Sequence, residues 1–301
     1  MVTTLTPANQ QFVDNINQIT GNINRDALEL SSGVTMRTVS DKPDQVSQLL
    51  QARAALSATQ QISTNLSQIK GESDAGEQAL ENAVQLFDQV QTIGATGASD
   101  TQTADSRATL AAQLQSIEQQ MVGLANTSFQ GRFLFSGDSD QVAAYTYDPA
   151  QANPVSSYQG AAATRQALHP NGTTFPTSLT AQQIFDSADP STNVFATLTN
   201  LVTAFQNNDI PAIQTLNGGL SKIGDYLNQQ LAFYGQVQDN VSSATDFAQN
   251  QQVQLQTEIS TLQDTDSTAA ILDLTQSQTT ESAALNAEAR IPRTTLFDFL
   301  A

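Results

Sequence analysis

The chain has 301 residues, of which 39% are hydrophobic and only 13% charged, so it can bury a sizeable core while amide and hydroxyl groups cover much of its surface. Eleven basic residues face 29 acidic ones, and the formal charge of −18 disfavours nucleic acid as a partner because a phosphate backbone would be repelled. The absence of cysteines and the single histidine exclude disulfides, cysteine nucleophiles and thiolate or multi-histidine metal sites. We see no membrane span and no secretory signal, so we expect no membrane insertion and, if the protein is exported, no cleaved Sec signal.

The first periodic segment lies near the N-terminus. Its large apolar residues recur at steps of four, three, four and seven, which places them on one stripe of an amphipathic helix. They are Phe12, Ile16, Ile19, Ile23 and Leu30. Gly33 suits the left-handed residue that follows a helix end.

A second helix is predicted to begin at Ser40-Asp41-Lys42-Pro43, where Ser or Asp suits the N-cap and Pro the first turn. Seam positions then alternate at steps of three and four from Ile62 to Val90, which is the pattern of a coiled-coil seam with a weak patch at Ser73 and Gly76. We therefore predict one helix over 43–93, bent at Gly71 or Gly76.

A turn over 94–100 and a further seam from Leu110 to Leu124 predict a helical hairpin. From 129 to 192 aromatic residues are interspersed with Gly, Asp and five prolines, which favours short strands joined by turns. Within this stretch, His169-Pro170-Asn171-Gly172 is typical of a hairpin turn, and we assign it no catalytic role.

The helical period returns at 194 and continues to 262, with a kink expected at Gly235. A last amphipathic segment follows, and the apolar residues at the end of the chain need a surface that covers them. These residues are Ile271, Leu274, Leu285, Ile291, Leu296, Phe297, Phe299 and Leu300.

Nothing in the sequence forms a recognisable catalytic constellation, so we expect no enzyme and no cofactor; only carboxylate-based glycosidase chemistry stays open. Asp138-Ser139-Asp140 with Asp148 offers oxygen ligands for a cation, but the Gly and closing Glu of a calcium loop are missing, and we predict a polar turn without metal. Arg107 and Arg132 are expected to pair with carboxylates across the bundle.

These elements predict a mainly α protein, an elongated antiparallel helical bundle or coiled coil formed by the two halves of the chain, with a small β-rich head inserted between them. Three regions are expected. They are a terminal helical assembly region of 1–38 and 266–301, a bundle core of 39–129 and 193–265, and a head of 130–192. A coiled-coil signalling or tail-fibre protein would need longer uninterrupted heptads.

Several motifs resemble the flagellin and FlgL family of flagellar proteins, and they span nearly the whole chain. Ser40-Asp41-Lys42-Pro43 and the run from Gly131 to Gly137 are closer to the hook-associated FlgL group than to flagellins. The other matching pieces are Leu30-Ser31-Ser32-Gly33, Tyr158-Gln159-Gly160, residues 262–266 and Thr295 to Leu300.

The resemblance implies a structural hook-associated subunit that links hook to filament in a homo-oligomeric ring of the flagellar axis. The alternative is a short flagellin that forms the filament itself. It also implies export without a cleaved signal to an extracellular site, a FlgN-type export chaperone that holds the C-terminal segment, a FlgK-type hook-associated protein below and flagellin above.

Both terminal stripes are too small to offset the conformational entropy of ordering them alone. We therefore hypothesise that the two ends are disordered in the monomer and fold together, antiparallel, as neighbouring copies cover their outer faces. The predicted assembly interface consists of Phe12, Ile16, Ile19, Ile23, Leu30, Leu274, Leu285, Ile291, Leu296, Phe297, Phe299 and Leu300.

Overall fold

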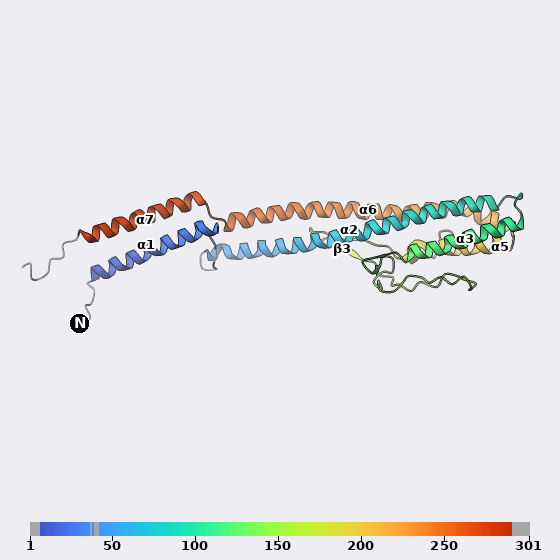
Figure 1. Cartoon of the computed structure of the whole chain (residues 1–301), viewed down its shortest axis with the longest axis horizontal. Coiled ribbons are helices and arrows are strands. Elements are labelled where there is room, and N and C mark those ends of the chain that lie inside the picture. The colour runs from blue at the N-terminus through green and yellow to red at the C-terminus, as the bar shows by residue number, and fades with distance from the viewer. Residues whose placement is uncertain (1–6, 37, 39–41, 291–301) are drawn as a thin grey trace, which may run out of the picture. The chain divides into compact units, whose positions relative to one another are not determined.

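The computed structural model describes residues 7–36, 38 and 42–290. Contacts divide the chain into two compact units. We name residues 1–57 with 252–301 the terminal unit and residues 58–251 the central unit. In each unit helices from the two halves of the chain lie side by side, which confirms the predicted antiparallel bundle with a small insert (Figure 1).

Two long helices frame the central unit. The helix α2 spans Pro43–Gly97 and α6 spans Ile210–Gln263. Within the central unit they run antiparallel, because Gln238 Nε2 donates to Asp74 Oδ1 at 3.0 Å while Thr59 Oγ1 donates to Gln251 Oε1 at 3.4 Å. A long pair of helices therefore replaces the separate short ones that an average globular domain would use.

Glycines inside α2 make room for aromatic rings. A Cβ at Gly76 would lie 2.6 Å from Cε1 of Tyr234, and a Cβ at Gly71 would lie 2.9 Å from Cζ of Phe129. The helix is uninterrupted at both positions, and α6 is likewise uninterrupted at Gly235. The helix cost of Gly, about 1 kcal/mol relative to Ala, is thus offset by ring packing at the first two positions.

A hairpin joins α2 to α3, which spans Ala104–Ala125 and packs on α5, Val194–Gln206. The turn starts later than predicted because α2 stays helical through Gly97. The buried guanidinium of Arg107 donates to the carbonyls of Gly97 at 2.9 Å and Ser99 at 2.7 Å, and to Asn208 Oδ1 at 2.8 Å. The prediction of a carboxylate partner for Arg107 was wrong. Backbone carbonyl groups at the end of α2, where the helix dipole is negative, accept its hydrogen bonds instead.

The insert between α3 and α5 contains two antiparallel hairpins of very short strands and one short helix. Its second hairpin turns at His169–Thr173, as the sequence predicted, and Gly172 adopts the left-handed φ of +91°. The elements are β1 Ser128–Phe129 with β2 Arg132–Phe133, β3 Gln166–Leu168 with β4 Thr174–Pro176, and α4 Ala181–Phe185.

Aromatic residues of the insert lie in the core of the central unit. Phe135 and Tyr145 are fully buried, and their rings meet Tyr234 at 6.1 Å and Phe195 at 5.0 Å between centroids. The region expected to form a head therefore shares its hydrophobic core with the helical bundle. The proposed three-region division stays a prediction, since the contacts separate two units.

Two arginines share a carboxylate of the insert, and one of them, Arg165, also pairs with α2. Arg165 pairs with Glu72 at 2.8 Å and with Asp140 at 3.1 Å, while Arg132 pairs with Asp140 at 2.5 Å. Arg132 thus has the carboxylate partner expected for it, although that partner lies in the insert. Asp140 of the acidic turn takes part in this ion-pair network. The hydrogen bonds from Gln141 and Arg132, and then the charges of Arg132 and Arg165, lower the pKa of Asp140.

Glu118 on α3 is a fully buried carboxyl that holds α3, α5 and the insert together. Thr199 Oγ1 donates to its Oε1 at 2.6 Å, and the hydroxyl of Tyr147 approaches its Oε2 at 3.4 Å. Burial raises the pKa of Glu118, although these two hydrogen bonds oppose the shift. Burial and the neighbouring Glu118 charge raise the pKa of Tyr147 to about 12.

We predict that Glu118→Gln raises the urea midpoint of unfolding at pH 7. A carboxyl whose folded pKa lies above its unfolded value stabilises the fold below the unfolded value of 4.5, and that stability is lost as pH rises through the folded pKa. The advantage of the variant should therefore shrink as pH falls toward 4. Urea unfolding followed by circular dichroism at pH 7 and at pH 4 measures this difference in stability. A variant that is less stable than wild type at pH 7 would contradict the prediction.

Candidate assembly interface

The terminal unit is built around an antiparallel pair of helices. The helix α1 spans Pro7–Ser32 and α7 spans Ser267–Ala289 (Figure 1). Thr20 Oγ1 donates to Glu281 Oε1 at 3.3 Å, and Val34 forms an antiparallel bridge with Asp264. The end of α1 therefore meets the start of α7, as predicted.

Capping residues bring the two helices together at this end. Gly33 takes a φ of +69°, and its N–H donates to the carbonyl of Glu29 at 2.8 Å, which closes α1 with a left-handed cap. Asp266 caps α7, because its side chain accepts hydrogen bonds from the N–H groups of Thr268 and Ala269. Between the caps, Thr35 N–H donates to Gln263 O at 2.7 Å.

The apolar stripe of α1 faces α7. Phe12, Ile16, Ile19 and Ile23 are each half-buried along the side of α1 that carries the contact to Glu281. The stripe therefore has a partner within the chain, the other terminal helix. None of the four reaches full burial, so the pair of helices leaves part of the stripe in contact with solvent.

The facing side of α7 is composed mainly of small and polar residues. Its more buried positions recur at steps of four and three, yet Leu274 is the only large apolar residue among them. Small side chains let two helices approach closely but bury little apolar area. These positions are Ala270, Leu274, Ser277, Glu281, Ala284 and Glu288.

A carboxylate occupies one position of the α1 stripe. Asp26 is 4% exposed; Arg25 donates to its Oδ1 at 2.9 Å, and its Oδ2 has no hydrogen-bond partner among the described residues. Sequence reasoning missed Asp26, although the step of seven between Ile23 and Leu30 leaves a stripe position three residues after Ile23. A buried oxygen without a partner weakens the contact between the two helices.

Large apolar residues of the pair point to solvent instead. Leu272 on α7 is 67% exposed and Leu285 is 51% exposed. Exposed apolar residues gathered on one helix pair are typical of a surface that a partner covers. The full set is Val13, Leu28, Leu30, Ile271, Leu272 and Leu285.

The predicted interface residues thus fall into three groups. Phe12, Ile16, Ile19, Ile23 and Leu274 are half-buried, whereas Leu30 and Leu285 are exposed. Ile291, Leu296, Phe297, Phe299 and Leu300 lie outside the described residues. The structure adds Ile271 and Leu272 to the exposed group, and their role in assembly stays a proposal.

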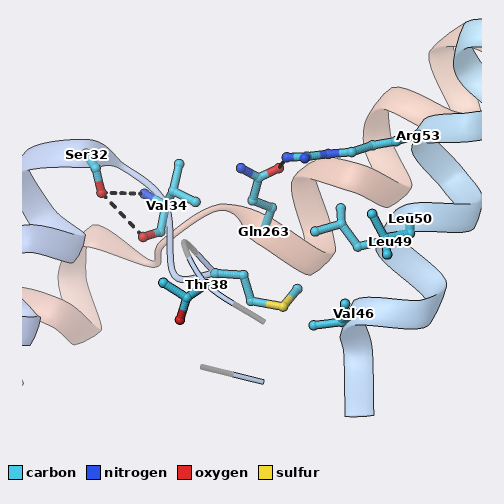
Figure 2. A pocket seen from close by; sticks show the side chains of 9 residues that line it. Ser32, Val34, Thr38, Val46, Leu49, Leu50, Arg53 and Gln263 are labelled. Atoms are coloured by element: carbon cyan, nitrogen blue, oxygen red, sulfur yellow. Dashed lines mark hydrogen bonds between the residues drawn. The ribbon is translucent and has the colours of Figure 1, made fainter. Parts of the chain in front are cut away.

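A pocket of about 410 Å³ lies where the segment after α1 meets the beginning of α2 (Figure 2). Its wall is mainly apolar and includes the largely exposed Leu50. On its rim, Arg53 Nη2 donates to Gln263 Oε1 at 2.5 Å. The apolar lining is formed by Val34, Met36, Val46, Leu49 and Leu50.

Comparison with protein families identifies the chain. The bacterial flagellin N-terminal helical region matches residues 2–140, and the bacterial flagellin C-terminal helical region matches residues 221–300. The chain belongs to the flagellin family. It is therefore a component of the flagellar axial structure, and the paired terminal helices lie within the two matched regions. No helix in the described part is long and apolar enough to cross a membrane.

Solved structures of hook-associated proteins share the fold. A protein of Vibrio parahaemolyticus, provisionally described as flagellar hook-associated, matches with a TM-score of 0.64 and 19% identity, over 74% of this chain and 99% of its own. FlgL of Xanthomonas campestris matches with a TM-score of 0.58 and 17% identity, over 70% of this chain and 99% of its own. FlgL of Bacillus cereus matches with a TM-score of 0.55 and 17% identity, over 71% of this chain and 99% of its own. No curated protein sequence matches the chain significantly.

We predict that the double variant Leu272→Ser, Leu285→Ser leaves the monomer nearly as stable as wild type, within about 0.5 kcal/mol, because both side chains are exposed. Incorporation into flagella should fall sharply, because both residues would contact neighbouring copies. The matched variant Ile19→Ser should instead weaken the α1–α7 contact in the monomer. Immunoblots of sheared flagella and culture medium measure incorporation and export; a double variant that is incorporated as well as wild type would refute the assignment.

Proposed function

We propose that this chain is the hook-associated junction subunit that links the hook to the filament through self-assembly of its terminal helices. The observation that carries the proposal is the set of large apolar residues on the α1–α7 pair that a single copy leaves exposed. Covering it would supply the driving force for association, because burial of apolar area is the dominant favourable term in most protein association.

The run from Gly131 to Gly137 supports the junction over the filament. It resembles the hook-associated group, and it closes against the rest of the insert: a Cβ at Gly137 would lie 2.2 Å from the carbonyl oxygen of Ala161. Phe135 within the run is fully buried against Tyr234 of α6. The motif therefore anchors the insert to the bundle, in a fold shared with FlgL structures.

The partners follow from this role. A ring of copies would have a FlgK-type hook-associated protein below it and flagellin above it. We further propose export without a cleaved Sec signal to the cell exterior, with a FlgN-type chaperone covering the C-terminal segment before export. The weakly packed α1–α7 pair supports this route, because a segment of low local stability is easily kept unfolded for export.

A short flagellin that forms the filament itself is the second candidate. It is favoured by the same two family matches, which cover flagellin regions without separating the groups. Both candidates would expose an apolar outer face on the terminal helices. They differ in what a cell lacks when the protein is removed.

Deletion of the gene is expected to leave hooks without filaments and to release flagellin into the medium, because filament subunits would have no base on which to polymerise. Electron microscopy of the cells and immunoblots of the medium measure both effects. Restoration by a plasmid copy is the control. Filaments of normal length on the deletion strain, or absent filaments without released flagellin, would contradict the junction role.

A further inference from the structure

We propose that Asp26 is a built-in destabilising residue of the α1–α7 pair, which keeps the two terminal helices able to separate in the free subunit. The inference deepens the proposed function and rests on its premise that the ends are kept unfolded for export and gain order among neighbouring copies. It follows from where Asp26 lies, how little of its charge is compensated and what α7 offers opposite it.

Asp26 occupies a position that the helical period assigns to an apolar residue. It follows Ile23 by three residues and precedes Leu30 by four, which continues the spacing of the α1 stripe. Asp26 is 4% exposed, whereas Ile19 and Ile23 are only half-buried. In the described part of α1, the most buried position therefore holds a carboxylate.

The charge of Asp26 is compensated at one oxygen only. Arg25 donates to Oδ1 from Nε at 3.1 Å and from Nη2 at 2.9 Å. The side chain of Arg25 is 62% exposed and lies 3.7 Å from Glu29 as well, so water and a second carboxylate weaken this ion pair. Oδ2 of Asp26 is buried without a hydrogen-bond partner among the described residues. The desolvation of this oxygen is therefore not offset, and it destabilises the closed pair.

The facing helix offers no group that could neutralise this carboxylate. Residues 267–289 contain no Lys, Arg or His, and Arg25 is the only basic residue within the two helices. Two of the more buried positions of α7 are themselves acidic, Glu281 and Glu288. Closing the pair therefore withdraws acidic side chains of both helices from water, with a single, largely exposed cation to compensate them.

Buried polar groups elsewhere in the chain are treated differently. The buried carboxyl of Glu118 in the central unit accepts hydrogen bonds from two hydroxyl groups. Among the described residues, the other buried side-chain atoms without a partner are the neutral hydroxyl oxygens of Ser73 and Ser136. The uncompensated charge thus falls in the terminal unit, on the contact that has to open.

Separation of the two helices returns Asp26 to water, so the pair opens at a lower free-energy cost than an uninterrupted apolar stripe would allow. An apolar residue at this position would continue the stripe and hold the pair closed in the free subunit. Such a pair would resist the unfolding on which the proposed export depends.

Hydrogen exchange on the full-length monomer measures the effect on the pair. Asp26→Leu should slow the exchange of amides in residues 10–30 and 272–290 about tenfold or more, because it removes the unpaired charge and extends the stripe. Asp26→Asn keeps the size of the side chain and removes only its charge, so it should slow exchange less. Asp14 is exposed on the same helix, and Asp14→Leu and Asp14→Asn should exchange as wild type.

Immunoblots of cell extracts, sheared flagella and culture medium measure export of the same variants. The exported fraction, counted as flagella plus medium, should fall at least about threefold for Asp26→Leu, because the closed pair unfolds less readily. Asp14→Leu should be exported as wild type. Counting both exported pools separates export from incorporation.

Unchanged or faster exchange of both helices in Asp26→Leu and Asp26→Asn, with helicity retained, would overturn the proposal. Slower exchange together with a wild-type exported fraction would overturn it as well, because opening of the pair would then not limit export. Should Asp26→Leu lose helicity, Asp26→Asn decides both measurements. None of these outcomes bears on the deletion phenotype, so failure of this proposal and failure of the junction role are distinguishable.

Discussion

Within the terminal unit, the contact between α1 and α7 buries few large side chains. The stability of this helix pair and the apolar area that it leaves exposed both depend on that constraint. The α1 stripe meets a face of α7 on which Leu274 is the only large apolar residue, and Asp26 places a carboxylate inside the contact. Leu272 and Leu285 lie on the exposed surface of the same helix. Apolar area that would stabilise the pair in a single chain is thus left exposed, and it is available to the contacts with other copies that we propose.

The central unit shows the opposite arrangement. Its helices and insert share one core in which Phe87, Phe135 and Phe205 are almost completely buried, and polar groups such as Glu118 and Arg107 hold the junctions between elements. The central unit thus has a densely packed core of its own. Weakly packed terminal helices and a fully packed central unit suit the proposed role, in which the ends gain order as the subunit joins its neighbours.

The sequence predicted those features whose pattern lies within a single helix or turn. The α1 stripe, the long seam of α2 and the hairpin turn at His169 follow from periodicity and turn chemistry. The face of α7 that contacts α1 could not be predicted in this way. The helical pattern is recognised from large apolar residues, whereas small residues such as Ala270 and Ala284 allow α7 to approach α1 closely. The role of Gly71 and Gly76 in making room for aromatic rings could not be predicted either. The rings that fill this space belong to Phe129 and Tyr234, which are distant in the chain.

Hydrogen exchange on the free monomer tests the central claim most directly. Marginal packing predicts that backbone amides of residues 10–30 and 272–290 exchange much faster than those of buried stretches of α2 and α6 in the central unit, because the terminal pair opens locally at low free-energy cost. Protection of both terminal helices equal to that of the central unit would contradict the account, since a pair already stable alone would not need neighbouring copies to complete it.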